Sequence, residues 1–199
     1  MLFKTTILAG SLVAAFTCAG ATSSSPFKID PYPKTVARPR NPSVARTREC
    51  TVKAKGNGKD DSISIFNAVK SCNKGGKVIL NGNYTVASPL DLTFLEAIDI
   101  EISGNITFPP NIDYWTEHSF KYTYQTSSAM WRFGGNDVNI YGGGLVDGQG
   151  NAWWLAEASN STLLRPTLFI LDGMTDATIS DLNFIDPPNA GIPTLSRLL

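Results

Sequence analysis

Residues 134–154, GGNDVNIYGGGLVDGQGNAWW, decide the fold of this chain of 199 residues. Val138 and Ile140 alternate with Asp137 and Asn139, which predicts an extended strand with one apolar face and one polar face. The three glycines that follow can turn the backbone tightly and can lie close to a neighbouring backbone. The stretch is therefore expected to be a strand that ends at a sharp corner.

Two looser copies of this sequence pattern lie nearby, DIEISGNITF at residues 99–108 and DATISDLNFID at residues 176–186. Short strands that recur with turn residues between them predict a coiled, repetitive β architecture. Strands are expected at residues 77–80, 84–86, 90–94, 98–102, 106–108, 130–133, 138–141, 167–171 and 177–180, with a polar, aromatic insertion at 113–128 and a loop or helical excursion at 151–166. The residues expected to stack in the core are Ile100, Ile102, Ile106, Val138, Ile140, Leu168, Ile170, Ile179 and Leu182.

One amphipathic helix is expected before these strands, over residues 62–73, where apolar residues recur at helical spacing. Asp60 or Asp61 is placed to cap its start, and Gly75 and Gly76 end it. Such a helix would cover the open end of a solenoid, which otherwise exposes its core and a strand edge.

The first part of the chain has the features of an exported protein. Residues 1–21 combine a short basic start, an apolar run and a small-residue cleavage site, so we interpret them as a secretory signal peptide. The apolar run is too short to cross a membrane. Residues 22–49 hold five prolines and six basic residues against two acidic ones. We interpret them as a disordered linker or arm, with a propeptide or a surface-binding arm as alternatives.

Export through an oxidising compartment favours a disulfide as the state of the cysteines. Removal of the signal peptide leaves Cys50 and Cys72, an even number in an oxidising compartment. A bridge between them would contribute about 3 kcal/mol. Free buried thiols or a metal pair are weaker alternatives, because no histidine or third cysteine lies near. The N-glycosylation motifs at Asn83, Asn105 and Asn160 also fit a secreted eukaryotic protein.

Several blocks resemble fungal family 28 glycoside hydrolases, and the exopolygalacturonases most closely. They are CTVKAKGNGKDDSISIFNAVKSCNKGGKVIL, IDIEISGNITF, YWTEHSF, RPTLF and the opening stretch, and together they cover residues 50–188. The resemblance implies an all-β, right-handed parallel β-helix. It also implies a secreted monomer that removes galacturonate from pectin by inverting hydrolysis, without a cofactor or a metal. The formal net charge is zero, so no global charge favours nucleic acid or a membrane as the partner.

The family's catalytic aspartates lie in NTD and DD motifs, near GHG and RIK motifs, and no position here matches them. No catalytic residue is therefore assigned, the substrate-binding residues stay unknown, and the chain is expected to be an inactive, truncated β-helix. Residues 189–199 depart from the family pattern. The alternative is a non-catalytic, secreted β-helix protein that binds pectin or another cell-wall polysaccharide.

Individual carboxylates and the one histidine have structural interpretations. Asp60 and Asp61 are the only adjacent carboxylates, and their place before a helix favours capping. Asp147 lies in a glycine-rich turn, where an aspartate commonly bonds its own backbone. His118 is the sole histidine and cannot form a metal site by itself.

Two kinds of side chain suit an acidic sugar. Trp153 and Trp154 could stack on sugar rings, although packing of the excursion against the solenoid is favoured. Arg132 and Arg165 could bind a galacturonate carboxylate, although bracing of loops is favoured.

Overall fold

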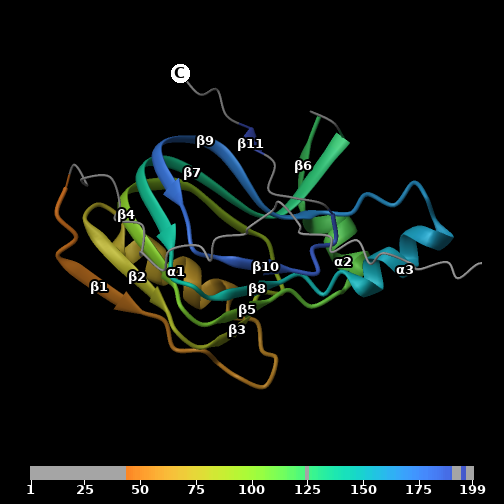
Figure 1. Cartoon of the computed structure of the whole chain (residues 1–199), viewed down its shortest axis with the longest axis horizontal. Helices are drawn as coiled ribbons and strands as arrows, with labels where there is room; N and C mark the ends of the chain where they lie inside the picture. The colour runs from red at the N-terminus through yellow and green to blue at the C-terminus, as the bar shows by residue number, and fades with distance from the viewer. Residues whose placement is uncertain (1–43, 124–125, 190–193, 196–199) are drawn as a thin grey trace, which may run out of the picture. The chain divides into compact units, whose positions relative to one another are not determined.

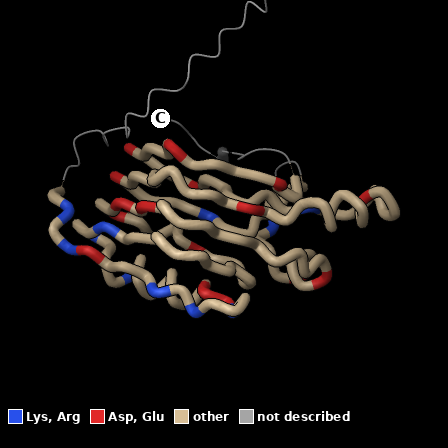
Figure 2. Tube along the Cα trace, turned by 60° about the horizontal axis from the view of Figure 1, so that its bottom comes forward, with Lys and Arg blue, Asp and Glu red and all other residues tan. Residues whose placement is uncertain are grey.

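A stack of coils is the main feature of the computed structural model, which describes residues 44–123, 126–189 and 194–195 (Figure 1). The coils run nearly parallel to one another (Figure 2). The parallel strands of a long sheet are β1 (Arg48–Thr51), β2 (Gly76–Leu80), β4 (Leu90–Ile102), β7 (Ser127–Tyr141), β9 (Thr167–Ile179) and β11 (Thr194–Leu195). Those of a short sheet are β3 (Asn83–Thr85), β5 (Asn105–Thr107), β8 (Leu145–Asp147) and β10 (Asn183–Ile185).

The connections make this arrangement a helix of strands. Each coil leaves the long sheet, crosses to the short sheet and returns to the long sheet beside the strand that it left. Crossovers between parallel strands of one sheet are right-handed. The structure is therefore the right-handed parallel β-helix that the sequence predicts.

Each long strand bends at one residue with a left-handed backbone. The φ angles of Ala97, Asp137 and Asp176 are 48°, 56° and 46°. Their flanking residues pair from strand to strand, so the three residues occupy equivalent positions on successive coils. The strands predicted separately at 90–94 and 98–102 are consequently the two arms of β4 on either side of this bend.

The apolar interior is built in ladders that run across the coils. Cys50, Val78, Ile100, Ile140 and Ile179 lie in register on successive strands of the long sheet. Parallel coils stack like residues over one another, so each side chain buries its neighbour on the next rung.

The predicted core is confirmed with one correction. The predicted core residues that are at most 2% exposed are Ile100, Ile102, Ile106, Val138, Ile140, Leu168 and Ile170. Ile179 and Leu182 are half-buried and pack against the core. Ile170, however, lies in register with Arg132 and outside the main apolar cluster, so its place in the central stack was predicted wrongly. Alternation assigns a strand residue to a face, but it does not say which of two buried faces is the interior.

The glycine corner behaves as its sequence predicts. A Cβ atom on Gly144 would collide with the carbonyl oxygens of Gly104 and Ile102, and one on Gly104 would collide with that of Gly82. The backbones of three successive coils therefore touch at this corner, where only glycine fits.

The predicted helix covers the first coil as α1 (Ser62–Cys72), with Ile65, Val69 and Cys72 buried. The sulfur atoms of Cys50 and Cys72 are bonded, with their Cα atoms 6.1 Å apart. This bridge joins β1 to the end of α1. No helix in the described part of the chain is long and apolar enough to cross a membrane.

Two excursions leave the coils. The predicted polar insertion contains α2 (Ile112–His118) and β6 (Phe120–Tyr122), which pairs antiparallel with the start of β7. Asn111 caps α2 by accepting the Tyr114 N–H at 3.2 Å. The second excursion contains α3 (Asn151–Ser159).

Candidate functional site

Charged side chains gather on the outer face of the long sheet, and the first group is the Arg132 cluster, defined as Asp91, Phe120, Arg132 and Asp172. Arg132 Nη2 donates to Asp91 Oδ2 at 2.6 Å, and Arg132 Nη1 lies 3.9 Å from Asp172 Oδ2. The guanidinium carbon lies 4.5 Å from the centre of the Phe120 ring. Because Phe120 belongs to the β6 hairpin, these contacts hold the hairpin against the sheet.

The charges of the Arg132 cluster do not suit an acidic ligand. Two carboxylates surround one guanidinium, so the net charge is negative. Burial acts to raise the pKa of Asp91, but hydrogen bonds from Arg132 and Thr93 outweigh it and lower that pKa. Asp91 therefore stays ionised and competes with any carboxylate for Arg132. The geometry supports the bracing role favoured from the sequence for Arg132.

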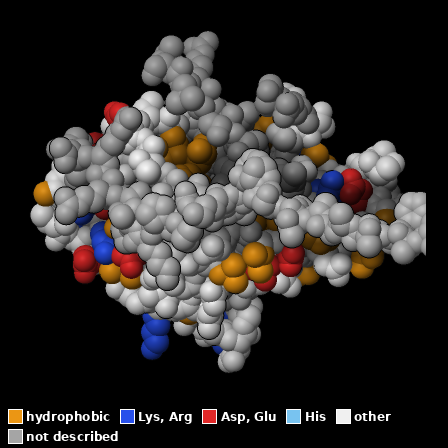
Figure 3. All heavy atoms as spheres, viewed as in Figure 1, with side chains coloured by type: hydrophobic (Ala, Val, Ile, Leu, Met, Phe, Trp, Pro, Cys, Tyr) orange, Lys and Arg blue, Asp and Glu red, His pale blue; other side chains and the backbone are white. Residues whose placement is uncertain are grey.

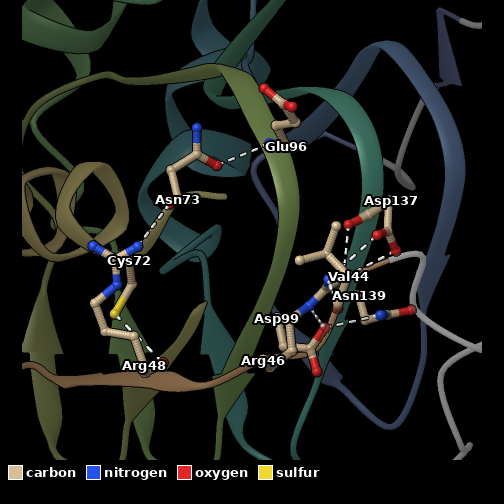
Figure 4. Close-up of polar contacts among 9 residues, drawn as sticks. All are labelled: Val44, Arg46, Arg48, Cys72, Asn73, Glu96, Asp99, Asp137 and Asn139. Carbon is tan, nitrogen blue, oxygen red and sulfur yellow. Dashed lines mark hydrogen bonds and ion pairs between the residues drawn. The ribbon is translucent and has the colours of Figure 1, made fainter. Parts of the chain in front are cut away.

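The second group is the Arg46 cluster, defined as Arg46, Asp99, Asp137 and Asn139 (Figure 4). Arg46 Nε donates to Asp99 Oδ1 at 3.0 Å, and Arg46 Nη2 donates to Asp137 Oδ1 at 2.9 Å. Asn139 Nδ2 donates to Asp99 Oδ1 at 2.9 Å. The side chain of Arg46 is only 7% exposed.

Arg46 belongs to the segment expected to be a disordered arm, so the fold begins earlier than the predicted boundary at residue 50. Burial acts to lower the pKa of Arg46, but hydrogen bonds to Asp137 and Asp99 outweigh it and raise that pKa. The cluster fastens the chain before β1 to β4 and β7, which come much later in the sequence.

The adjacent carboxylates Asp60 and Asp61 have separate structural tasks. Asp60 Oδ1 accepts the N–H groups of Ser62 and Ala87, each at 3.0 Å. Asp61 stands at the N-cap position of α1 but makes no side-chain capping bond, and its Oδ2 accepts the Thr85 N–H at 3.0 Å. The prediction that Asp60 or Asp61 caps the helix is thus confirmed by Asp60, which accepts the first N–H of the helix. Both aspartates tie the start of α1 to the second coil.

The carboxylate of Asp60 makes the stability of the first coil depend on pH. Burial acts to raise its pKa, but hydrogen bonds from Ser62 and Ser88 outweigh it and lower that pKa. A depressed pKa adds stability above the unfolded value of about 3.9, and the contribution is lost as the pH falls through the folded pKa. We expect Asp60→Asn to lower the free energy of unfolding by about 1 kcal/mol at neutral pH, after allowing for solvent screening. The difference should shrink below about pH 4.

Urea unfolding of Asp60→Asn and the parent at several pH values measures this difference. Glu117→Gln is the matched control, because the Glu117 side chain is 80% exposed and its neutralisation should change stability by less than about 0.5 kcal/mol. A difference for Asp60→Asn that stays constant from neutral to acid pH would contradict the assigned role.

Asp147 and His118 have local partners. Asp147 Oδ1 accepts the Gln149 N–H at 2.9 Å, as predicted for an aspartate in this turn. His118 Nδ1 lies 2.9 Å from the Tyr114 carbonyl oxygen, and the two rings stack with their centres 4.2 Å apart. Within the described ranges, no group of three or more histidine, cysteine, aspartate or glutamate side chains could hold a metal ion.

The two tryptophans of α3 lie in different environments. Trp153 is fully buried, as packing predicts, whereas Trp154 is 41% exposed. Arg165 Nη2 lies 2.8 Å from Glu157 Oε1, and Arg165 Nη1 donates to the Pro188 carbonyl at 2.8 Å. Arg165 therefore braces α3. The described apolar side chains on the face seen in Figure 3 form small, separate patches.

The residues that sequence reasoning missed are those of the Arg46 cluster. Asp99 and Asn139 stand at equivalent places in the copies DIEI (99–102) and NIYG (139–142), and they pair directly across β4 and β7. Aligning the repeated phrases would have brought these two together. Nothing in the local sequence marks Arg46, because its partners lie on coils formed far later in the chain.

The chain resembles known proteins throughout the β-helix. Residues 64–195 match the family model of glycosyl hydrolases family 28. Exopolygalacturonase A of Aspergillus niger is 45% identical over 181 residues, which cover 86% of this chain and 41% of the relative. The exopolygalacturonase of Cochliobolus carbonum is 42% identical over 167 residues, which cover 83% of this chain and 37% of the relative. The chain thus spans about two fifths of the length of these relatives.

Solved structures agree with this assignment. The endo-xylogalacturonan hydrolase of Aspergillus tubingensis superposes with a TM-score of 0.63 at 30% identity, over 73% of this chain and 39% of that one. The polygalacturonase of Erwinia carotovora ssp. carotovora shares the fold, with a TM-score of 0.56 at 18% identity over 77% of this chain and 46% of that one. From the extent of the family match and the shared coils, the chain belongs to glycosyl hydrolase family 28.

Proposed function

We propose that the protein is an exo-acting hydrolase of galacturonan, the acidic polysaccharide of pectin, and that it cleaves the α-1,4 bond with inversion. The observation that carries this proposal is the similarity of the described coils to proteins named exopolygalacturonases, at 42–46% identity. Within the proposal, residues 50–188 supply the cap and the first coils of the β-helix, and residues 1–21 direct secretion.

Residues 1–199 do not themselves supply the catalytic pair in this proposal. Inverting hydrolysis needs one protonated carboxyl and one ionised carboxyl on opposite sides of the scissile bond. The lowered pKa values of Asp60 and Asp91 make both poor proton donors, and Asp147 is bonded within its own turn. The sequence also contains no NTD, GHG or RIK motif.

The experiment compares the 199-residue chain with a chimera. In the chimera, the chain continues into the corresponding later coils of Aspergillus niger exopolygalacturonase A, whose identity over the shared part is 45%. We expect no galacturonate from the chain alone and release of monomeric galacturonate by the chimera. Chromatography of the products from polygalacturonate measures both.

Three results would contradict this proposal, the first by moving the catalytic pair into residues 1–199 and the other two by contradicting the function itself. Galacturonate release by the 199-residue chain, abolished by replacing one of its aspartates, would place the chemistry in these coils. Oligomeric products from a folded chimera would contradict exo-action. Tight binding of pectin by the chain, with a folded but inactive chimera, would favour the alternative of a non-catalytic pectin-binding protein, which the bonded carboxylates of the described coils also fit.

A further inference from the structure

Two of the three N-glycosylation motifs lie side by side on the short sheet. Asn83 begins β3, Asn105 begins β5, and the parallel register pairs them directly. Both asparagine side chains are exposed, whereas Tyr84 and Ile106 beside them are buried in the core. The alternation of the strands thus presents both glycan-accepting amides on the outer surface, one rung apart.

A hydrogen bond joins the two amides, with Asn105 as the donor and Asn83 as the acceptor. Asn105 Nδ2 donates to Asn83 Oδ1 at 2.8 Å. An N-glycan replaces one hydrogen on Nδ2 of its asparagine. A glycan on Asn83 therefore leaves the acceptor of this bond unchanged, whereas a glycan on Asn105 substitutes the donor nitrogen itself.

The two positions also differ in the room around them. The short sheet runs in the order β10-β8-β5-β3, so Asn83 lies on the edge strand. Asn105 has Asn83 on one side and Leu145 on the other. Neighbouring strands are only about 4.8 Å apart, so sugars attached on both rungs would crowd each other at their first rings.

We propose that the folded protein carries a single N-linked oligosaccharide on this pair, at Asn83, and that Asn105 remains an unmodified amide. This inference rests on the secretory route in the proposed function, but it does not depend on catalysis. Asn160, beyond the end of α3, is exposed and far along the chain from the pair, so its motif reports on the secretory route independently.

Two matched variants test the proposal, because Thr85 and Thr107 are themselves paired in register. Thr85→Ala and Thr107→Ala each destroy one motif and leave both asparagines in place. The parent and the variants are secreted from a eukaryotic host, and their intact masses are measured before and after enzymatic removal of N-glycans. Glycopeptide mapping then assigns the modified asparagines.

We expect Thr85→Ala to lose one glycan and Thr107→Ala to lose none. Loss of a glycan in Thr107→Ala, or an unchanged number in Thr85→Ala, overturns the proposal. Thr162→Ala, in the third motif, is the control for the route. A parent that is secreted without a glycan on Asn83 or Asn105 refutes the inference and leaves secretion standing, whereas a parent that stays inside the cells without any N-glycan refutes the inference and the eukaryotic secretory route together.

Discussion

Replacing Arg46 with alanine is expected to lower the free energy of unfolding by about 3–5 kcal/mol at neutral pH. The Arg46 side chain is 7% exposed and binds Asp99 and Asp137, whose side chains are 8% and 10% exposed. Its removal leaves two buried carboxylates without their cation, and each repels the other. Urea unfolding followed by circular dichroism measures the loss.

Arg48→Ala is the matched control for this prediction. Arg48 lies two residues along the same segment and makes one exposed hydrogen bond, from Nη2 to the Asn73 carbonyl at 3.4 Å. Arg48→Ala should lower the free energy of unfolding by less than about 1 kcal/mol. Adding Asp99→Asn and Asp137→Asn to Arg46→Ala should recover part of the lost stability, because neither amide requires a cation. A loss of less than about 1 kcal/mol in Arg46→Ala would show that the cluster does not hold the chain to the sheet.

Ile140→Asp is expected to abolish cooperative folding. Ile140 is fully buried and lies in register between Ile100 and Ile179. An unpaired carboxyl group there loses the apolar contacts and is removed from water, which together cost several kcal/mol, a large part of the roughly 5–15 kcal/mol by which a domain is stable. The measurement is the soluble yield and the unfolding transition of the purified protein.

Two further variants serve as controls for Ile140→Asp. Asn136→Asp places the same side chain on β7 at an exposed position, where it loses the hydrogen bond from Asn136 Nδ2 to Thr175 Oγ1, and should cost no more than about 1 kcal/mol. Ile140→Val should cost about 1 kcal/mol, since it removes a single methylene group from the ladder. A soluble Ile140→Asp protein with a cooperative transition close to that of the parent would contradict the assigned register.

Sequence reasoning found the parts of the fold that depend on local pattern. Alternation located the arms of β4 and β7, and helical spacing located α1. It divided β4 at residues 95–97, because a left-handed residue such as Ala97 carries no signal of its own. It also missed α2, although Asn111 is a recognisable cap, because polar and aromatic residues dominate that helix.

The candidate site was less predictable than the fold. Bracing was favoured correctly for Arg132 and Arg165, since a long cationic side chain near a loop commonly finds a carboxylate. The Arg46 cluster depends on the register between coils, which no single stretch of sequence encodes. Charge pairs between distant strands can be inferred only after the rungs have been aligned.

The uneven lengths of the coils have a consequence for how this scaffold can change. Ile98 pairs with Gly76 after a short coil and with Val138 after one that contains α2 and β6, and the rungs meet equally well in both cases. The lengths of the excursions are therefore decoupled from the register, although Trp115 of α2 and Trp153 of α3 are fully buried in the core and tie each excursion to the ladders. New loops grafted between Phe108 and Ser127 would therefore have to keep Trp115 and Phe120 in place, together with the ladder residues and the corner glycines.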